Sequence, residues 1–302
     1  MSAADSGLVQ SVKQRLLNRS RQRGEAFNAV LARYAIERLL YRLTKTPHGE
    51  RFILKGAMLF SAWFQAPHRP TRDVDLLGPP EATAASITGV FREACEVAVE
   101  PDGLVFDAAT LRVDEIREGQ VYHGLRVRLT ARLGKARIPV QVDVGLGDVV
   151  TPPPRRITFG PMLDLPPPVM KSYAPETVIA EKLEAVVARG LANSRMKDFH
   201  DLWWMCTSMT LDGARLVQAV RATFRRRRRD LPGQTPEGLS DAFAAAPGKA
   251  AQWAAFARKS GLVEVPPLAD VVSAIRAFAG PLLMAVPDEP TANMQWRDGA
   301  WR

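Results

Sequence analysis

The sequence predicts an α+β fold, with an N-terminal mixed or antiparallel sheet flanked by helices and then a C-terminal helical domain. Two observations lead to this prediction. Segments in which polar and apolar residues alternate, the period of a strand, fall within residues 51–144. From residue 175 onward, apolar residues recur at spacings of three and four, the period of a helix. Strands followed by a run of helices are typical of α+β proteins.

The first half of the chain contains an ordered series of strands and helices. A helix is predicted where apolar residues fall on one helical face, and a strand where they alternate between turn signals. In chain order we expect a helix at 24–43, a strand at 51–54, a helix at 58–64, a strand at 73–77, a helix at 83–98, and strands at 111–116, 125–133 and 138–144.

The second half is separated from the first by a segment rich in proline. Residues 151–168 contain seven prolines, which exclude a continuous helix there. The predicted helices after it are 177–188, 196–209, 211–224, two between 236 and 259, and 269–279. We therefore expect a domain at 1–150, a connection at 151–174, a helical domain at 175–285 and an irregular tail at 286–302.

Composition restricts the class of protein. The 302 residues include 41 Lys and Arg against 32 Asp and Glu, a net charge of +9, which favours association with nucleic acid or nucleotides. The two cysteines, Cys95 and Cys206, have no metal-site spacing, which fits a reducing compartment. No apolar run approaches the ~20 residues of a membrane span. We expect a cytoplasmic protein that does not engage a membrane.

Two acidic residues lie two positions apart in the predicted strand at 73–77. Because side chains alternate between the faces of a strand, Asp73 and Asp75 project from one face while Val74 and Leu76 project from the other. Two carboxylates this close repel each other unless solvent or a cation compensates their charge, and Mg²⁺ prefers such oxygens. The pair alone is equally compatible with a solvent-facing strand end.

A third carboxylate favours the metal-site interpretation. Asp143 lies in the alternating strand at 138–144, which can place it beside the first pair. Three acids on neighbouring strands can hold two metal ions, which lower the pKa of an attacking hydroxyl and stabilise a leaving phosphate oxygen. The sequence therefore predicts a metal-dependent phosphoryl-type displacement at Asp73, Asp75 and Asp143.

A glycine lies where the strand at 51–54 turns into the helix at 58–64. Backbone amides at such a turn can face a triphosphate, and Gly56 leaves room for the approach. Lys55, Arg69 and Arg72 supply positive charge nearby in the sequence. A single glycine at a strand end is also compatible with an ordinary turn, so this position gains meaning only together with the carboxylates.

Four blocks in the same order resemble a known family. They are Leu54-Lys55-Gly56-Ala57-Met58-Leu59, Arg69-Pro70-Thr71-Arg72-Asp73-Val74-Asp75-Leu76, Glu181-Lys182-Leu183-Glu184-Ala185, and Arg195-Met196-Lys197-Asp198-Phe199-His200-Asp201-Leu202. These blocks resemble the AbiEii/AbiGii-type nucleotidyltransferase toxins, which include the MenT toxins and belong to the DNA polymerase β-like superfamily. Beyond residue 202 the likeness is only that the chain is helical.

The resemblance implies a nucleotidyltransferase-type N-terminal domain and a set of site residues. The implied catalytic residues are Asp73, Asp75, Lys182, Asp198 and Asp201; the implied nucleotide-binding residues are Lys55, Gly56, Thr71, Arg72 and Lys182; the implied metal ligands are Asp73, Asp75 and Asp143. It also implies a toxin that uses Mg²⁺ or Mn²⁺ and an NTP to add nucleotides to RNA, at the 3′ end of tRNA. Such transfer blocks translation, and an antitoxin is the expected partner.

The glycine turn departs from the family pattern. Ala57 and Met58 stand where a second small residue and a hydroxyl are common, so only backbone amides can contact phosphate there. Thr71, two residues before Asp73, stands where family members carry Ser or Thr. We hypothesise that its modification blocks the metal site by adding negative charge, which mass spectrometry of inactive preparations can test.

Basic and aromatic residues suggest how RNA is held. Five consecutive arginines, Arg225, Arg226, Arg227, Arg228 and Arg229, and a second cluster within 13–23 can bind phosphates, although such runs are also typical of solvated surfaces. Trp203 and Trp204 can stack on a base, and at least one of them is expected in the core.

Two other functions stay open at this stage. One is a non-catalytic nucleic-acid-binding protein on a nucleotidyltransferase scaffold, suggested by the incomplete glycine turn. The other is phosphoryl transfer to a protein partner, because the same carboxylates can direct a γ-phosphate. The preferred NTP, the acceptor, the number of nucleotides added and the oligomeric state cannot be derived from the residues.

Overall fold

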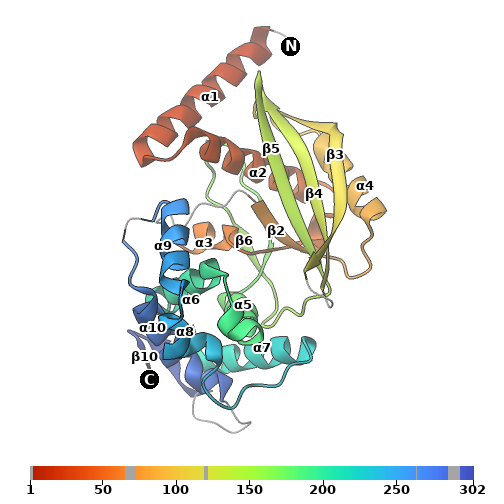
Figure 1. Ribbon diagram of the computed structural model, residues 1–302. Helices are drawn as coiled ribbons and strands as arrows, with labels where there is room; N and C mark the ends of the chain where they lie inside the picture. The colour runs from red at the N-terminus through yellow and green to blue at the C-terminus, as the bar shows by residue number, and fades with distance from the viewer. Residues whose placement is uncertain (1–2, 65–72, 119–121, 263, 285–292) are drawn as a thin grey trace. The chain divides into compact units, whose positions relative to one another are not determined.

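The computed structural model describes residues 3–64, 73–118, 122–262, 264–284 and 293–302, and the chain forms two compact units (Figure 1). The first contains Met1–Gly147 and Arg155–Ser172, and the second contains Asp148–Pro154 and Tyr173–Arg302. The first unit is built on a sheet and the second is mostly helical. The predicted α+β class is confirmed.

The first unit contains a mixed seven-stranded sheet in the order β3-β4-β5-β2-β1-β7-β6. Its elements are α1 (Ala3–Arg23), α2 (Phe27–Lys45), β1 (Ile53–Lys55), α3 (Met58–Trp63), β2 (Asp73–Gly78), α4 (Ala84–Glu96), β3 (Leu104–Glu118), β4 (Tyr122–Leu133), β5 (Ala136–Leu146), β6 (Arg155–Thr158) and β7 (Val169–Ser172), with a 3-10 turn at Gly49–Arg51. β2 pairs with β5, and β1 with β7, in parallel; the other neighbours are antiparallel.

One face of the sheet forms the core of this unit. Helices α2 and α4 pack on the sheet, and apolar side chains that alternate along the strands point inward, including Val74, Val127, Val142 and Val144, all fully buried. The opposite face carries the polar residues of each alternating pair. The strands predicted at 73–77, 125–133 and 138–144 are therefore present, each slightly longer than expected.

Three parts of the first unit differ from the sequence prediction. β3 begins at Leu104, seven residues before the predicted strand, because a register shift between Asp107 and Arg112 breaks the two-residue alternation. Residues 155–158 and 169–172 form strands at the edge of the sheet, whereas we expected an extended connection. Each has only four residues, too few for a clear alternation between prolines. Residues 3–23 form a helix rather than only a basic cluster.

The second unit consists of packed helices and a small sheet. Its elements are α5 (Pro175–Arg189), α6 (Met196–Ser208), β8 (Leu211–Asp212), α7 (Gly213–Arg226), α8 (Asp241–Ala245), α9 (Lys249–Lys259), α10 (Leu268–Leu283), β9 (Gln295–Arg297) and β10 (Ala300–Trp301), with 3-10 turns at Gly190–Ala192 and Glu237–Leu239. No helix within the described ranges is long and apolar enough to cross a bilayer.

The end of the chain is more regular than expected. β9 and β10 form a hairpin that pairs with β8, and Asp298 and Gly299 at its turn both have positive φ, as a tight hairpin turn requires. Trp296 is buried in it and donates from Nε1 to the Cys206 carbonyl at 2.6 Å. The hairpin thus anchors residues 295–301 to α6, so the tail is not simply irregular surface chain.

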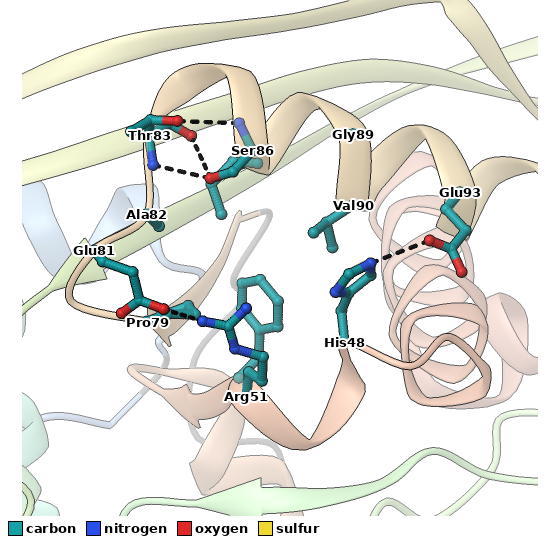
Figure 2. A pocket seen from close by; sticks show the side chains of 12 residues that line it. His48, Arg51, Pro79, Glu81, Ala82, Thr83, Ser86, Gly89, Val90 and Glu93 are labelled. Carbon is teal, nitrogen blue, oxygen red and sulfur yellow. Dashed lines mark hydrogen bonds and ion pairs between the residues drawn. The ribbon is translucent and has the colours of Figure 1, made fainter.

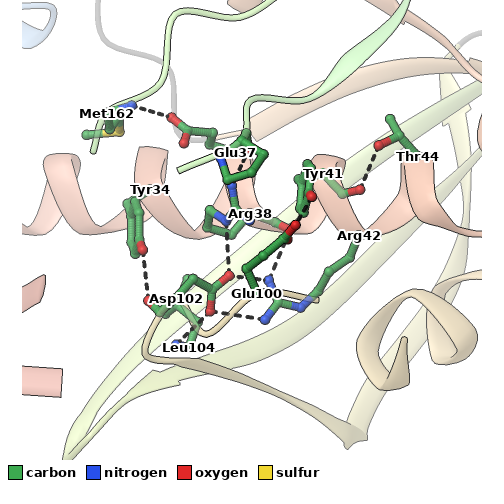
Figure 3. A network of polar contacts seen from close by, with 11 residues as sticks. Tyr34, Glu37, Arg38, Tyr41, Arg42, Thr44, Glu100, Asp102, Leu104 and Met162 are labelled. Carbon is green, nitrogen blue, oxygen red and sulfur yellow. Dashed lines mark hydrogen bonds and ion pairs between the residues drawn. The ribbon is translucent and has the colours of Figure 1, made fainter. Parts of the chain in front are cut away.

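A buried ionic network holds helix α2 in the first unit (Figure 3). Asp102, only 1% exposed, accepts from Arg38 Nε at 3.0 Å and from Arg42 Nη2 at 3.1 Å. Arg38 also donates to the Pro166 carbonyl at 2.7 Å. Burial raises the pKa of Asp102, but Arg42, the Leu104 amide and Arg38 outweigh it and hold that pKa below its ordinary value. One carboxylate therefore joins α2, the start of β3 and the segment before β7.

We expect Asp102→Asn to lower the free energy of unfolding by about 3–5 kcal/mol, because it leaves two buried guanidinium groups without their anion. Chemical denaturation followed by circular dichroism measures the change. Asp164→Asn is the matched control, since Asp164 also pairs with an arginine, Arg15 at 2.7 Å, but is 99% exposed. That control should cost less than about 1 kcal/mol. Equal effects of the two variants would contradict this role for the network.

Candidate functional site

Five charged residues form one row across the outer face of the first unit's sheet. Lys55 on β1 lies opposite Asp75 on β2, Asp75 lies opposite Asp143 on β5, Asp143 opposite Arg126 on β4, and Arg126 opposite Asp114 on β3. Residues directly opposite each other on paired strands share a face. The row therefore brings Asp75 and Asp143 side by side between two cations, as the sequence predicted for the two acids.

The buried side of the same strands sets the position of the carboxylates. Val74 and Leu76 on β2 are fully buried beside Val142 and Val144 on β5. A slip of one residue would bring Asp75 into the core, so the register is strongly specified. Asp73 lies two residues before Asp75 and on the same face. Asp73, Asp75 and Asp143 thus lie on two adjacent parallel strands.

Gly56 lies directly against Asp75. Its φ of +74° is in the left-handed region, and a Cβ built there would lie 2.0 Å from Asp75 Oδ2 and 2.8 Å from Asp75 Cβ. The second distance matters because rotating the aspartate side chain does not move its own Cβ. Only glycine fits a turn that approaches this carboxylate so closely.

We expect Gly56→Ala to weaken Mn²⁺ binding at least about tenfold, a loss of roughly 1.4 kcal/mol, because the new methyl group displaces Asp75. Isothermal titration measures the affinity. Gly24→Ala is the matched control: its φ of +63° imposes a similar backbone cost, yet nothing lies within 4 Å of the added Cβ. If both variants bind Mn²⁺ like the unsubstituted protein, Asp75 does not ligate the ion.

Arg126 is a residue of this site that the sequence analysis missed. Its Nε and Nη2 donate to the two oxygens of Asp143 at 2.8 and 2.7 Å, and both side chains are partly buried. The alternation along β4 places Arg126 outward, but only the pairing of β4 with β5 shows which acid it meets. In this structure the arginine supplies the positive charge that compensates the third carboxylate.

The donor chemistry of the row fits a hard divalent cation. Asp73 and Asp75 offer carboxylate oxygens of the kind Mg²⁺ and Mn²⁺ prefer, and the absence of a side chain at Gly56 lets the Asp75 carboxylate lie directly against the turn. Within residues 3–64, 73–118 and the rest of the described chain, no group of three or more His, Cys, Asp or Glu residues is already arranged around a common point. The pairing of Asp143 with Arg126 is one physical reason, because both Asp143 oxygens face the guanidinium.

We expect Arg126→Gln to tighten Mn²⁺ binding by about tenfold, because a neutral amide no longer competes with the cation for Asp143. Electron paramagnetic resonance of free Mn²⁺ gives the affinity without any reaction. Adding Asp143→Asn to this variant should remove the gain. Weaker binding by Arg126→Gln would mean instead that the arginine holds Asp143 in its binding position.

A second cluster of charges lies inside the second unit. Lys182 on α5 donates to Asp198 Oδ1 at 2.9 Å and to Asp201 Oδ2 at 2.7 Å, and both acids, three residues apart on one face of α6, are almost fully buried. Arg195 donates to the other Asp198 oxygen at 2.6 Å. Burial raises the pKa of Asp198, but Lys182 and Arg195 outweigh it, so that this pKa lies below its ordinary value.

The structure therefore brings Lys182, Asp198 and Asp201 together, as the third and fourth sequence blocks suggested. Arg195, in the fourth block but not among the expected site residues, completes the cluster. Lys182 lies midway along α5, where its neighbours Ile179 and Leu183 pack into the core. Its side chain is 14% exposed.

Comparison with known proteins decides the family. The sequence model of the family described as "Nucleotidyl transferase AbiEii toxin, Type IV TA system" matches residues 38–277. This chain belongs to the AbiEii nucleotidyltransferase family. The match spans well over half of the chain and includes both the carboxylate row and the Lys182 cluster.

A solved structure resembles this AbiEii-family chain in its fold. The crystal structure of JHP933 from Helicobacter pylori is 13% identical, with a TM-score of 0.50, over 85% of this chain and 93% of that one. A second crystal structure, described as a "putative nucleotidyltransferase from H. pylori", is 12% identical, with a TM-score of 0.49, over 85% of this chain and 96% of that one. No curated protein matches the sequence.

The arginine run of this AbiEii-family chain is partly used inside the fold. Arg229 Nε donates to Glu184 Oε1 at 3.0 Å, and Arg227 donates to the other oxygen of the same buried carboxylate. Both contacts join the end of α7 to α5. Arg225, Arg226 and Arg228 are exposed. Part of the charge of the arginine run is therefore compensated within the fold by Glu184.

Some expected residues lie outside the part of the chain that the structure describes. They are Arg69, Thr71 and Arg72, in the segment before β2. Trp203 and Trp204 are on α6, and both are partly exposed. We expected at least one of them in the core, but neither side chain is fully buried.

A cavity of about 480 Å³ lies in the first unit away from the carboxylates (Figure 2). Phe52 and Ile87 line its apolar part, and the ion pair Arg51–Glu81 and the hydrogen bond between His48 and Glu93 involve other residues that line it. It is lined by residues that precede β1 and follow β2, whereas Asp75 pairs with Lys55 at the other end of these strands. The cavity is therefore separate from the carboxylate row.

Proposed function

We propose that this AbiEii-family protein is the toxin of a toxin-antitoxin pair and transfers nucleotides from an NTP to RNA. The proposed acceptor is the 3′ end of tRNA, and the modification blocks translation. The observation that carries the proposal is the pair Asp75 and Asp143 on adjacent strands, with Asp73 on the same face and Gly56 against Asp75. This arrangement suits a polymerase β-like, metal-dependent displacement at phosphorus.

Each residue of the row has a proposed task. Asp73 and Asp75 hold Mg²⁺ or Mn²⁺, with Asp143 as the third ligand once it leaves Arg126. A cation bound there lowers the pKa of the attacking hydroxyl and stabilises the departing pyrophosphate oxygen. Lys55 and the backbone amides around Gly56 contact the triphosphate of the nucleotide, for which a glycine turn beside a lysine is suited.

The other proposed site residues come from two places. Thr71 and Arg72 directly precede Asp73 in the sequence and contribute to nucleotide binding. Lys182 supplies a point charge for a phosphate oxygen, and Asp198 and Asp201 hold its amine in place. The exposed Arg225, Arg226 and Arg228 attract the RNA backbone. A cognate antitoxin completes the proposed system, which operates in the cytoplasm.

Label transfer from NTPs to total tRNA tests this function. We expect the protein to incorporate label with at least one of the four NTPs in the presence of Mg²⁺, and Asp73→Asn to reduce incorporation by at least about a hundredfold. Asp107→Asn is the matched control, because Asp107 is another aspartate on this sheet, paired with Arg132 at 3.1 Å, but lies outside the carboxylate row.

The released product separates the remaining functions. Pyrophosphate marks nucleotidyl transfer, whereas release of an NDP with label on protein would mark phosphoryl transfer to a partner and overturn the proposal. Tight RNA binding that is unchanged by Asp73→Asn, with no label incorporated from any NTP, would indicate a non-catalytic RNA-binding protein on this scaffold.

A further inference from the structure

An aromatic cluster on α6 and α9 takes no part in the proposed chemistry. His200 lies at its centre and is 1% exposed. Its ring centroid lies 5.6 Å from that of Phe256, 5.9 Å from that of Trp203, 6.2 Å from that of Trp204 and 6.3 Å from that of Trp253. Four aromatic side chains thus surround one buried imidazole within the second unit.

The cluster has a buried part and an open part. Trp253 is buried and donates from Nε1 to the Pro266 carbonyl at 2.9 Å, and this hydrogen bond fixes the position of its ring. Phe256, whose ring centroid is 5.6 Å from that of Trp253, is partly exposed, and so is Trp203. Trp203 and Phe256 therefore present ring surface to solvent on a rigid base formed by His200 and Trp253.

The exposed charged residues on α6 and α9 are all positive. Lys259 follows Phe256 by three residues, which places both on one side of α9, and Arg258 is its exposed neighbour. Lys197 is exposed near the start of α6. None of these three cations has an acidic partner within the part of the chain that the structure describes, and α9 contains no acidic residue.

We propose that Trp203 and Phe256 form a stacking platform for an unpaired base of RNA, with the flanking phosphates held by Lys197, Arg258 and Lys259. Partly exposed rings with adjacent cations are the pattern of single-strand binding surfaces, because every base has a flat face and every nucleotide a phosphate. Bases in a duplex are already stacked on each other, so the platform selects a single-stranded end. That this RNA is the acceptor rests on the proposed function.

Fluorescence anisotropy with a labelled single-stranded 12-mer of uridine, without NTP or divalent cation, tests the platform on the full chain. We expect Trp203→Leu and Phe256→Leu each to weaken binding about tenfold, while Trp203→Phe, which keeps a flat ring, binds like the unsubstituted protein. Lys197→Gln should reduce the slope of log affinity against log salt by about 0.7.

The matched control is Trp301→Leu. Trp301 is also partly exposed and stacked on a phenylalanine, Phe278 at 5.8 Å, but belongs to β10. We expect it to leave RNA binding unchanged. Thermal melting by circular dichroism identifies any variant that fails to fold, in which case Trp203→Phe compared with Trp203→Met in folded protein decides the question.

Three results would overturn the platform. They are equal RNA affinity of Trp203→Leu and the unsubstituted protein, tighter binding of duplex than of single-stranded RNA, and loss of binding to a protein partner while RNA binding stays intact. Because the assay contains no NTP, such results leave nucleotidyl transfer itself untouched. Conversely, a protein that binds the 12-mer through Trp203 but transfers no label would disprove the proposed function and keep the platform.

Discussion

The candidate site depends above all on the parallel pairing of β2 with β5. This pairing sets Asp75 opposite Asp143 and Asp73 opposite Gln141, and it is held by valine and leucine side chains on the buried face. Like charges directly opposite each other destabilise a sheet. Lys55 and Arg126, which lie on either side of the two acids in the same row, reduce this repulsion. Hydrophobic burial thus specifies the register, and the two cations offset the repulsion between the acids that this register brings together.

Much of this arrangement follows from the sequence, because strands with one buried face have a visible period. Alternation predicted that Asp73 and Asp75 share a face and that Asp143 lies in a strand that can place it beside them. It did not predict Arg126, since a partner across two strands depends on register rather than on spacing along the chain. The early part of β3 was missed because its bulge interrupts the alternation. The Lys182 cluster was found only through resemblance, because its members come from two helices.

Buried ion pairs recur in both units and have a common logic. Asp102 joins α2 to the sheet, Lys182 joins α5 to α6, and Glu184 joins α5 to α7. Removing one partner of such a pair leaves the other as an uncompensated buried charge, which destabilises the fold. The intact pair itself contributes little net stability. Such contacts select one arrangement of helices over others of similar hydrophobic burial. In the Lys182 cluster the same carboxylates that fix the position of the amine also compensate its charge.

The basic charge of the chain has to be divided between folding and recognition. A run of five arginines suggests a polyanion-binding surface. Two of them form ion pairs with Glu184, so the run contributes less uncompensated charge than its composition indicates. Charge alone also cannot separate single-stranded from duplex RNA, because both present phosphates. Discrimination requires groups that contact the bases, and the groups proposed for this role are the partly exposed rings of Trp203 and Phe256, which lie on the same two helices as exposed cations. Under the proposed function, affinity from phosphates and selectivity from stacked bases would therefore reside in different residues. Substitutions in the two sets should alter salt dependence and strand preference independently.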